Sequence, residues 1–444
     1  MEKRAFLKNS SLNASGALLS PLMTHANDGV RTNWAGNLTY RTDNLHQPKT
    51  VAKAQQTIRD CDQLRVLGTR HSFNAIADST ANQVNLDKFD QAMRVDPEEQ
   101  TVTVDAGVSY GRLSTFLDQQ GYALHNLASL PHISVAGACA TATHGSGVRN
   151  GNLATAVAAM EFINARGELV RLSRHADGDT FRGAVVHLGG IGLVTKLTLD
   201  VVLTFEMKQW VYLNLPMEQM QTHFDEIMSA GYSVSLFTDW KGNDINQVWV
   251  KQKADAADPD KDFYGATAAP RDVHPIIDIS AENCTAQMGV VGPWYERMPH
   301  FRMNFTPSSG KELQSEFFVP REHAVDALMA VNRLSEHIAP HLLISEVRAI
   351  AADDLWMSPC YRQPSIALHF TWKQDWDKVR KVLPLIEQAL DAYDVRPHWG
   401  KLFTLAPAKL QHRYSQLADF KALLQQYDGN GKFRNEFLAG SLYA

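Results

Sequence analysis

The sequence predicts an α+β fold built from two domains. Three observations lead to this prediction. The chain has 444 residues, and globular domains usually have about 100–200 residues. Strand-like and helical segments are mixed without the regular alternation of a βαβ array. The character of the segments also changes near residue 205, so the main boundary is placed there. A composition of 44 % hydrophobic and 20 % charged residues is ordinary for a globular protein.

The first half of the chain alternates short strands and helices. Residues 51–64 carry apolar side chains at helical spacing, and residues 65–67 form a short apolar strand ended by Gly68. The other predicted elements of this half are a strand at 101–104, a helix at 110–120 that stops at Gly121, a hairpin of 157–163 and 168–172, and a strand at 193–202.

The second half contains aromatic and polar strands and longer helices. The strands are predicted at 234–237, 344–350, 366–372 and 397–403, the helices at 323–337 and 376–393, and an acid-rich loop at 253–261.

Three of these strands carry polar side chains at comparable positions. Successive side chains of a strand point to opposite faces, so Glu346 and Arg348 share one face of the first strand, as do His369 and Thr371 of the second. Lys401 is placed at the start of the third. A sheet with one hydrated face is the simple alternative for any single strand. Three such strands together favour a polar site.

Charge and cysteine content exclude several classes of protein. The formal net charge is −5 with both signs abundant, which gives no electrostatic reason to expect nucleic acid or a membrane surface as partner. The four cysteines are far apart in sequence, without a CxxC pair. We therefore expect buried free thiols. The histidines show no paired ligand spacing, so no metal site is expected. The protein is also expected to be a monomer.

The N-terminal 30 residues resemble an export signal. Lys3-Arg4 precedes Phe6-Leu7-Lys8 and a short run rich in Ser, Ala and Leu, which is typical of twin-arginine signals except that Lys3 replaces the first arginine. The run is too short and too polar to span a bilayer. Residues 1–30 are therefore predicted to direct export to the periplasm; without such a signal the protein is cytoplasmic.

Several common catalytic motifs are absent from the sequence. It contains no GxxxxGK[ST] phosphate loop, no HExxH metal helix, and no strand followed by GxGxxG. Gly145-Ser146-Gly147 does not fit the GxSxG motif of serine hydrolases.

Two segments indicate a ligand with phosphate groups. Gly68-Thr69-Arg70-His71-Ser72 lies where a strand turns, and consecutive N–H groups in such a turn can bind an anion. Residues 134–147 are nearly all small, which allows the backbone to approach a large ligand closely. Taken alone, His71 is more simply an ordinary hydrogen-bonded histidine, and the small-residue run a surface loop.

Together these segments resemble the vanillyl-alcohol oxidase type of flavoprotein. In that family a Gly-x-x-His-Ser segment carries the histidine bonded to the flavin 8α carbon. Residues 427–435 are similar to the family's C-terminal pattern, although Gly429 stands where proline is commoner. The resemblance extends over nearly the whole chain and is greatest to the bacterial alditol (xylitol, sorbitol) oxidase branch, notably at Asn33-Trp34-Ala35-Gly36-Asn37 and Ala128-Ser129-Leu130-Pro131-His132.

This resemblance implies a two-lobed FAD-binding domain at 31–205, a substrate domain with an antiparallel sheet at 206–400, and a C-terminal segment, 401–444, that returns to the FAD site. FAD would be attached covalently through His71. The other implied cofactor-binding residues are Gly68, Thr69, Arg70, Ser72, Ser129, Ser134, Gly137, Ala138, Cys139, Ala140, His144 and Val185. The implied polyol-binding residues are Ser129, Glu346, Arg348, Thr371 and Lys401.

The expected reaction transfers a hydride from the terminal carbon of an alditol to flavin N5, and O₂ becomes H₂O₂. Arg348 and Lys401 would stabilise the developing alkoxide, and Lys401 would share in accepting the proton. Glu346 would balance both cations and bind a hydroxyl, while His369 either lies near the flavin or supports Thr371. The alternatives are an aldonolactone oxidase or dehydrogenase with the same cofactor, and a non-catalytic carbohydrate-binding protein.

Overall fold

The computed structural model, which describes residues 30–303 and 311–444, begins with a small parallel sheet. Its strands are β1 (Leu45–His46), β3 (Gln83–Val84) and β2 (Arg65–Val66), in that order. Helix α1 (Val51–Asp60) starts at Thr50, whose side chain accepts a hydrogen bond from the third residue of the helix.

A five-stranded antiparallel sheet follows, in the order β4-β5-β9-β7-β8. Its strands are β4 (Met93–Asp96), β5 (Thr101–Asp105), β9 (Leu193–Asp200), β7 (Val157–Ile163) and β8 (Leu169–Ser173). The helices of this region are α2 (Tyr110–Gln119), α3 (Val135–Ala140) and α4 (Arg174–Val185), and β6 (Tyr122–Ala123) pairs with β10 (Val202–Leu203). The predicted strands, helix and hairpin of this half are confirmed. The small-residue run differs, because its first part forms α3.

The second half forms a ten-stranded sheet. Its members are β11 (Glu206–Pro216), β12 (Ser233–Thr238), β13 (Asp244–Lys253), β14 (Asp262–Phe263), β15 (Ala266–Ala268), β16 (Gly292–Pro293), β17 (Glu312–Pro320), β18 (Leu342–Ile350), β19 (Ser365–Lys373) and β20 (Arg396–Pro397). The path runs β14-β15-β11-β13-β12-β18-β19-β17-β20, with β16 added beside β11. Every pair in it is antiparallel, as expected.

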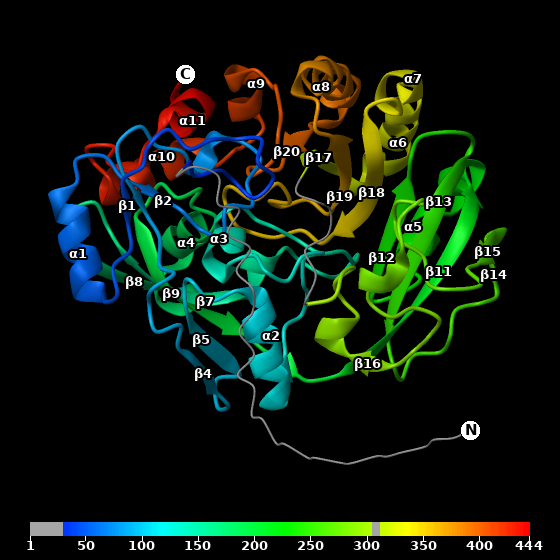
Figure 1. Cartoon of the computed structure of the whole chain (residues 1–444), viewed down its shortest axis with the longest axis horizontal. Coiled ribbons are helices and arrows are strands. Elements are labelled where there is room, and N and C mark those ends of the chain that lie inside the picture. Colours follow the sequence, from blue (N-terminus) through cyan, green and yellow to red (C-terminus); the bar gives the residue numbers. More distant parts are fainter. Residues whose placement is uncertain (1–29, 304–310) are drawn as a thin grey trace, which may run out of the picture. The chain divides into compact units, whose positions relative to one another are not determined.

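Helices cover one face of this sheet (Figure 1). They are α5 (Met217–Met228), α6 (Ala324–Asn332) and α8 (Trp376–Leu390), with the short α7 (Ser335–Ile338) beyond α6. Alternate strand residues such as Val347, Leu368 and Phe370 join the helices in one buried core. Their neighbours along the strands therefore point to the opposite face, which is free to carry a site.

The C-terminal helices pack against the first half of the chain. They are α9 (Pro407–His412), α10 (Leu417–Tyr427) and α11 (Glu436–Leu438); α10 contacts α4, and α11 contacts the short helical turn Ala75–Ala77. The buried guanidinium of Arg65 donates hydrogen bonds to the carbonyls of Ile76, Leu188, Gly189 and Phe433.

Residues 31–444 form one compact unit that contains both the helix-covered core and a second core shared by the first half and the C-terminal helices. The predicted domain limits at 205 and 400 stay predictions.

One predicted strand is wrong. Of residues 397–403, only Pro397 belongs to a strand, as the last residue of β20 beside β17. The chain then turns, with the amide of Lys401 bonded to the carbonyl of His398. Lys401 therefore extends from a turn after β20, where its side chain is not restricted to one face of a sheet.

Candidate active site

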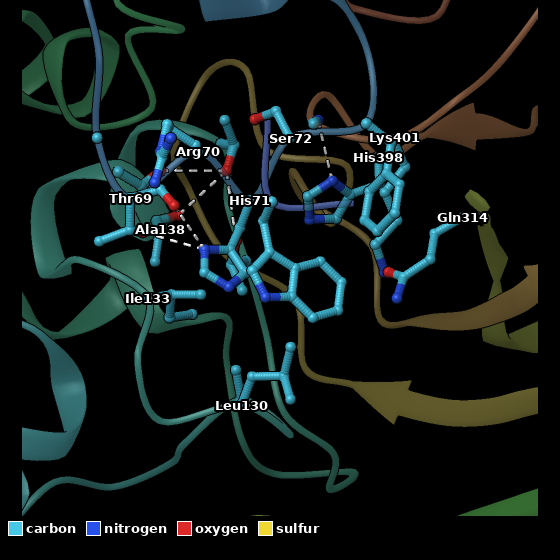
Figure 2. Close-up of a pocket in the computed structure, with 18 of the residues that line it drawn as sticks. Thr69, Arg70, His71, Ser72, Leu130, Ile133, Ala138, Gln314, His398 and Lys401 are labelled. Carbon is cyan, nitrogen blue, oxygen red and sulfur yellow. Dashed lines mark hydrogen bonds between the residues drawn. The ribbon is translucent and has the colours of Figure 1, made fainter. Parts of the chain in front are cut away.

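A cavity of about 900 Å³ lies between the small-residue segments of the first half and the uncovered face of the large sheet. Figure 2 shows residues 69–72 on one side of it and Gln314, His398 and Lys401 on the other. Ligand pockets commonly measure about 300–1,000 Å³, so this cavity is among the larger ones.

His71 lies on the cavity wall in a turn after β2. Its Nδ1 is 2.9 Å from the carbonyl oxygen of Thr69, and its ring stacks on Trp34 at 5.2 Å between centroids. Burial and the nearby His132 lower the pKa of His71 to about 3, so the ring is neutral at pH 7. Its Nε2 is buried and has no hydrogen-bond partner among the described residues. A neutral imidazole that is fixed through Nδ1 and whose Nε2 is unused is suited to form a bond to a cofactor.

The backbone beside His71 makes close contacts that need small residues. A Cβ on Gly68 would lie 3.0 Å from Oγ of Ser134, and one on Gly137 would lie 2.7 Å from the same atom. The left-handed residue of the turn is Arg70, with φ of 66°, rather than Gly68. The turn and α3 therefore form a narrow cradle, which suits the phosphates and ribityl chain of a dinucleotide.

Most of the predicted cofactor-binding residues line this cavity: Gly68, Thr69, Arg70, His71, Ser72, Ser129, Ser134, Gly137, Ala138, Ala140 and His144. Cys139 and Val185 do not. Both are 2 % exposed and belong to the core, and the sulfur of Cys139 is 3.5 Å from the Tyr110 hydroxyl. Their side chains serve packing. The residues that do line the cavity nevertheless fit FAD.

The predicted polyol-binding side chains meet on the uncovered face of the sheet. The register pairs Glu346 of β18 with His369 of β19, and His369 with Glu316 of β17. Thr371 is paired with Gln314 one step along the same face. The alternation predicted for the two strands is thus confirmed, and their polar sides meet in one place.

Glu316 is the centre of this cluster, and sequence reasoning missed it. One carboxylate oxygen is 2.7 Å from Nη2 of Arg348, and the other is 2.7 Å from Nζ of Lys401. The first is also 3.3 Å from Nε2 of His144. Glu316 is only 1 % exposed. Lys401, His144 and Arg348 hold its pKa well below the usual range against the effect of burial.

Glu346 therefore does not balance both cations as predicted, since Glu316 pairs with Lys401 and more closely with Arg348. Glu346 receives a 2.7 Å hydrogen bond from Nε2 of His300 and lies 3.6 Å from Nε of Arg348. Arg348 and His300 keep its pKa far below the usual value, although burial opposes them. It is a carboxylate at neutral pH.

His369 links two of the predicted residues. Its Nδ1 is 2.8 Å from Nζ of Lys401, and its Nε2 is 3.0 Å from the hydroxyl of Thr371. Burial and Lys401 lower the pKa of His369 to about 3, so the ring is neutral. Burial also lowers the pKa of Lys401, while Glu316 opposes that shift. His369 thus supports Thr371, one of the two alternatives, and also holds Lys401.

Ser129 reaches the cluster from the first half of the chain. Its hydroxyl lies 3.4 Å from Nη1 of Arg348. Gln314, His300 and His398 also line the cavity and were not predicted. The alternating polar residues 312, 314 and 316 carried the signal for Gln314 and Glu316. No local pattern marks His300, because it lies outside regular structure.

In the described part of the chain, no helix is long and apolar enough to cross a membrane. No group of histidine, cysteine and acidic side chains there is arranged to hold a metal ion. Cys61, Cys139, Cys284 and Cys360 are buried and free, as expected.

Known proteins similar to this chain include FAD-binding enzymes, in agreement with the cavity beside His71. Residues 43–173 match the FAD binding domain family, and residues 301–440 match the D-arabinono-1,4-lactone oxidase family. The chain is 47 % identical to alditol oxidase of a Streptomyces strain over 92 % of this chain and 97 % of that protein. It is 24 % identical to L-gulonolactone oxidase of Bos taurus over 95 % and 100 %. A solvent-stable cholesterol oxidase shares the fold, with a TM-score of 0.74, 15 % identity, and coverage of 93 % and 97 %.

Proposed function

Since the chain belongs to the alditol oxidase family of FAD-dependent enzymes, we propose that it oxidises the terminal CH–OH of an alditol such as xylitol or sorbitol. The substrate loses a hydride and a proton and becomes an aldose, and O₂ is reduced to H₂O₂. The observation that carries the proposal is the Arg348–Glu316–Lys401 cluster, which faces the same cavity as His71.

We propose that His71 bonds covalently to the flavin 8α carbon. Its fixed, neutral ring with an unpartnered nitrogen supports this role. The cradle of Gly68, Ser134 and Gly137 would hold the diphosphate and ribityl chain. When bound, FAD supplies the hydride acceptor, as the cofactor carries the redox chemistry that side chains lack.

The polar side chains bind and orient the polyol. Ser129, Thr371 and the Glu346 carboxylate would bind hydroxyls along the chain, and this fixes the terminal carbon in place. Arg348 and Lys401 would stabilise negative charge as it develops on the terminal oxygen.

Lys401 would take the hydroxyl proton. Its lowered pKa increases the fraction of neutral amine, which is the form able to accept a proton. Glu316 then keeps the resulting ammonium stable, because its carboxylate already lies 2.7 Å from Nζ.

An aldonolactone oxidase or dehydrogenase is the second candidate, favoured by the match of residues 301–440. A visible spectrum separates the two. We expect the flavin absorbance to bleach when xylitol or sorbitol is added without oxygen and to return with H₂O₂ when air is admitted. Bleaching by L-gulono-1,4-lactone and not by either alditol would instead establish the lactone reaction.

We also propose that residues 1–30 direct export of a folded monomer to the periplasm. These residues lie, except for Val30, outside those that the structure describes. Replacing Lys3 and Arg4 with glutamine should retain the enzyme in the cytoplasm, as cell fractionation would show. Light scattering should give the mass of one chain. An unchanged distribution or a dimer mass would contradict the respective proposal.

A further inference from the structure

We infer that His300 is a positioning residue that fixes the Glu346 carboxylate so that one oxygen is free for a substrate hydroxyl; this rests on the proposed polyol oxidation. His300 lies in an irregular segment with no predicted role, yet it lines the cavity and is 5 % exposed.

The backbone of this segment is fixed on both sides of His300. Lys251 of β13 is completely buried, and its Nζ donates to the carbonyls of Met298 and Pro299 at 2.6 and 2.9 Å. The carbonyl of His300 accepts a 2.9 Å hydrogen bond from the amide of Thr285. A buried lysine is costly unless its donors are used. Here they hold the segment that carries His300.

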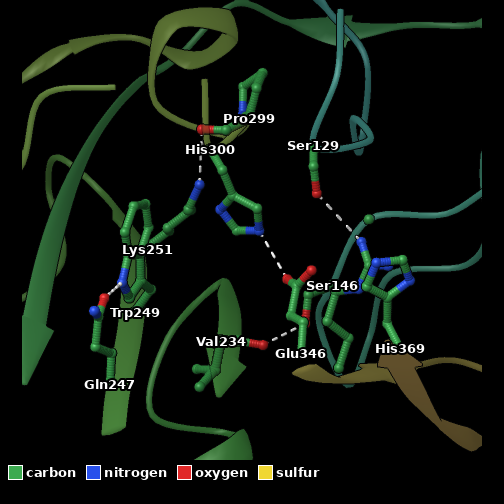
Figure 3. Close-up of polar contacts among 12 residues, drawn as sticks. Ser129, Ser146, Val234, Gln247, Trp249, Lys251, Pro299, His300, Glu346 and His369 are labelled. Carbon is green, nitrogen blue, oxygen red and sulfur yellow. Dashed lines mark hydrogen bonds and ion pairs between the residues drawn. The ribbon is translucent and has the colours of Figure 1, made fainter. Parts of the chain in front are cut away.

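The ring of His300 is fixed as well. It packs edge to face against Phe237 and Trp249, with centroids 5.3 Å away in each case. Figure 3 shows Lys251, His300 and Glu346 in succession. Burial and the nearby Lys251 lower the pKa of His300 to about 4, so the ring is neutral at pH 7. Its Nε2 then carries the single proton and donates it to Glu346.

Both polar contacts of Glu346 in the described part of the chain involve the same oxygen. Oε1 accepts from His300 and faces Nε of Arg348, whereas Oε2 makes no hydrogen bond or ion pair with the described residues. A carboxylate held by one oxygen presents the other in a defined direction. His300 thereby prepares Glu346 to accept a hydrogen bond from a hydroxyl distant from the reacting carbon.

Two amide variants test this inference because they differ in reach. In His300→Gln the side-chain amide nitrogen lies near the position of Nε2 and can still donate to Glu346. In His300→Asn the side chain is too short for its amide nitrogen to reach Glu346. Both lose the ring packing equally. His125→Asn, at a half-buried histidine outside the cavity, is the control for fold and flavin content.

Anaerobic bleaching at increasing xylitol concentration gives the binding constant and the limiting rate separately. We expect His300→Asn to weaken binding about 10- to 100-fold, the range for loss of a hydrogen bond to a charged group. The limiting rate should change less than about threefold, and His300→Gln should recover most of the binding. Equal behaviour of the two variants, or a loss confined to the limiting rate, would overturn the inference.

A second readout does not depend on turnover. Nitrogen-15 NMR of labelled histidine, with His300 assigned by its loss in His300→Gln, should show a proton on Nε2 in the protein without substrate. A proton on Nδ1 alone would also overturn the inference. If the wild-type protein is not bleached by any alditol while Nε2 carries the proton, the proposed substrate fails and the positioning of Glu346 stands.

Discussion

At the scale of single residues, the site combines buried side chains of opposite charge. Removing one member of a pair would affect stability more than removing the whole pair. Glu316 pairs with both Arg348 and Lys401, and Glu346 lies beside Arg348, so two carboxylates face two basic side chains. Buried ion pairs contribute little net stability, but an unpaired member costs about 3–5 kcal/mol. A variant at this site must therefore be judged by catalysis and folding together.

The covalent bond proposed between His71 and the flavin can be tested by replacing His71. The wild-type protein should remain yellow after precipitation with acid, and His71→Ala should release its flavin into the supernatant. His132→Ala, at a neighbouring ring 5.0 Å away, is the matched variant and should retain the colour. A colourless wild-type precipitate would defeat the covalent linkage.

Two variants of Lys401 distinguish the effect of its positive charge from its role in accepting the proton. Lys401→Ala should lower the limiting rate about 10²–10⁴-fold, the usual contribution of a general acid or base, while flavin content stays normal. Lys401→Arg keeps the positive charge without an amine that deprotonates. It should bind xylitol well and still react slowly; near-normal turnover would show that only the charge matters.

At the scale of helices and strands, periodicity predicted much of the site and missed its centre. The period of two placed Glu346 and Arg348 on one face of β18 without any structure. Along β17 the alternation is less clear, because Glu316 is followed by two phenylalanines. Its neighbours across the sheet come from distant segments. The order of strands in a sheet is not encoded in the local sequence pattern. The contact between Glu316 and His369 therefore could not be predicted from the sequence.

Turns limited the prediction in a different way. The apolar residues around Lys401 predict a strand, but β20 ends at Pro397. Similarly, the left-handed position in the His71 turn is occupied by Arg70 and not by Gly68. Tertiary contacts decide both cases.

The role of β17 leads to a prediction about stability. Glu316→Gln leaves Arg348 and Lys401 buried beside an uncharged amide, so unfolding should become easier by about 3–5 kcal/mol. Glu322→Gln, at an exposed glutamate just after the same strand, should change the free energy of unfolding by less than about 0.5 kcal/mol. Urea denaturation measures both, and equal stabilities would show that Glu316 is not essential to the charge balance.

At the scale of the whole molecule, the two halves meet at Asp353 after β18. Its carboxylate accepts hydrogen bonds from Asn152 at 2.7 Å and Ser358 at 2.5 Å. Burial nevertheless raises its pKa to about 7. The two halves are therefore joined by a group that gains charge near neutral pH.

This raised pKa gives stability a defined pH dependence. Between about pH 4 and 7 the folded protein binds more protons at Asp353 than the unfolded chain, so stability falls as pH rises through that window. Asp353→Asn should reduce the fall in the free energy of unfolding over this pH range by about 1–2 kcal/mol, a figure that allows for the partial exposure of Asp353. Thermal unfolding from pH 4.5 to 8 checks this, and parallel profiles for the two proteins would contradict it.

The hydrogen bonds of Arg65 have a consequence for synthesis. One carbonyl that its guanidinium requires belongs to Phe433, and Asn435 also donates to the carbonyls of Ala75, Ile76 and Asp78. The ribosome makes these residues after the whole of the first half and after the strands of the large sheet. The hydrogen bonds of Arg65 thus stay incomplete until a residue 368 positions later has been synthesised.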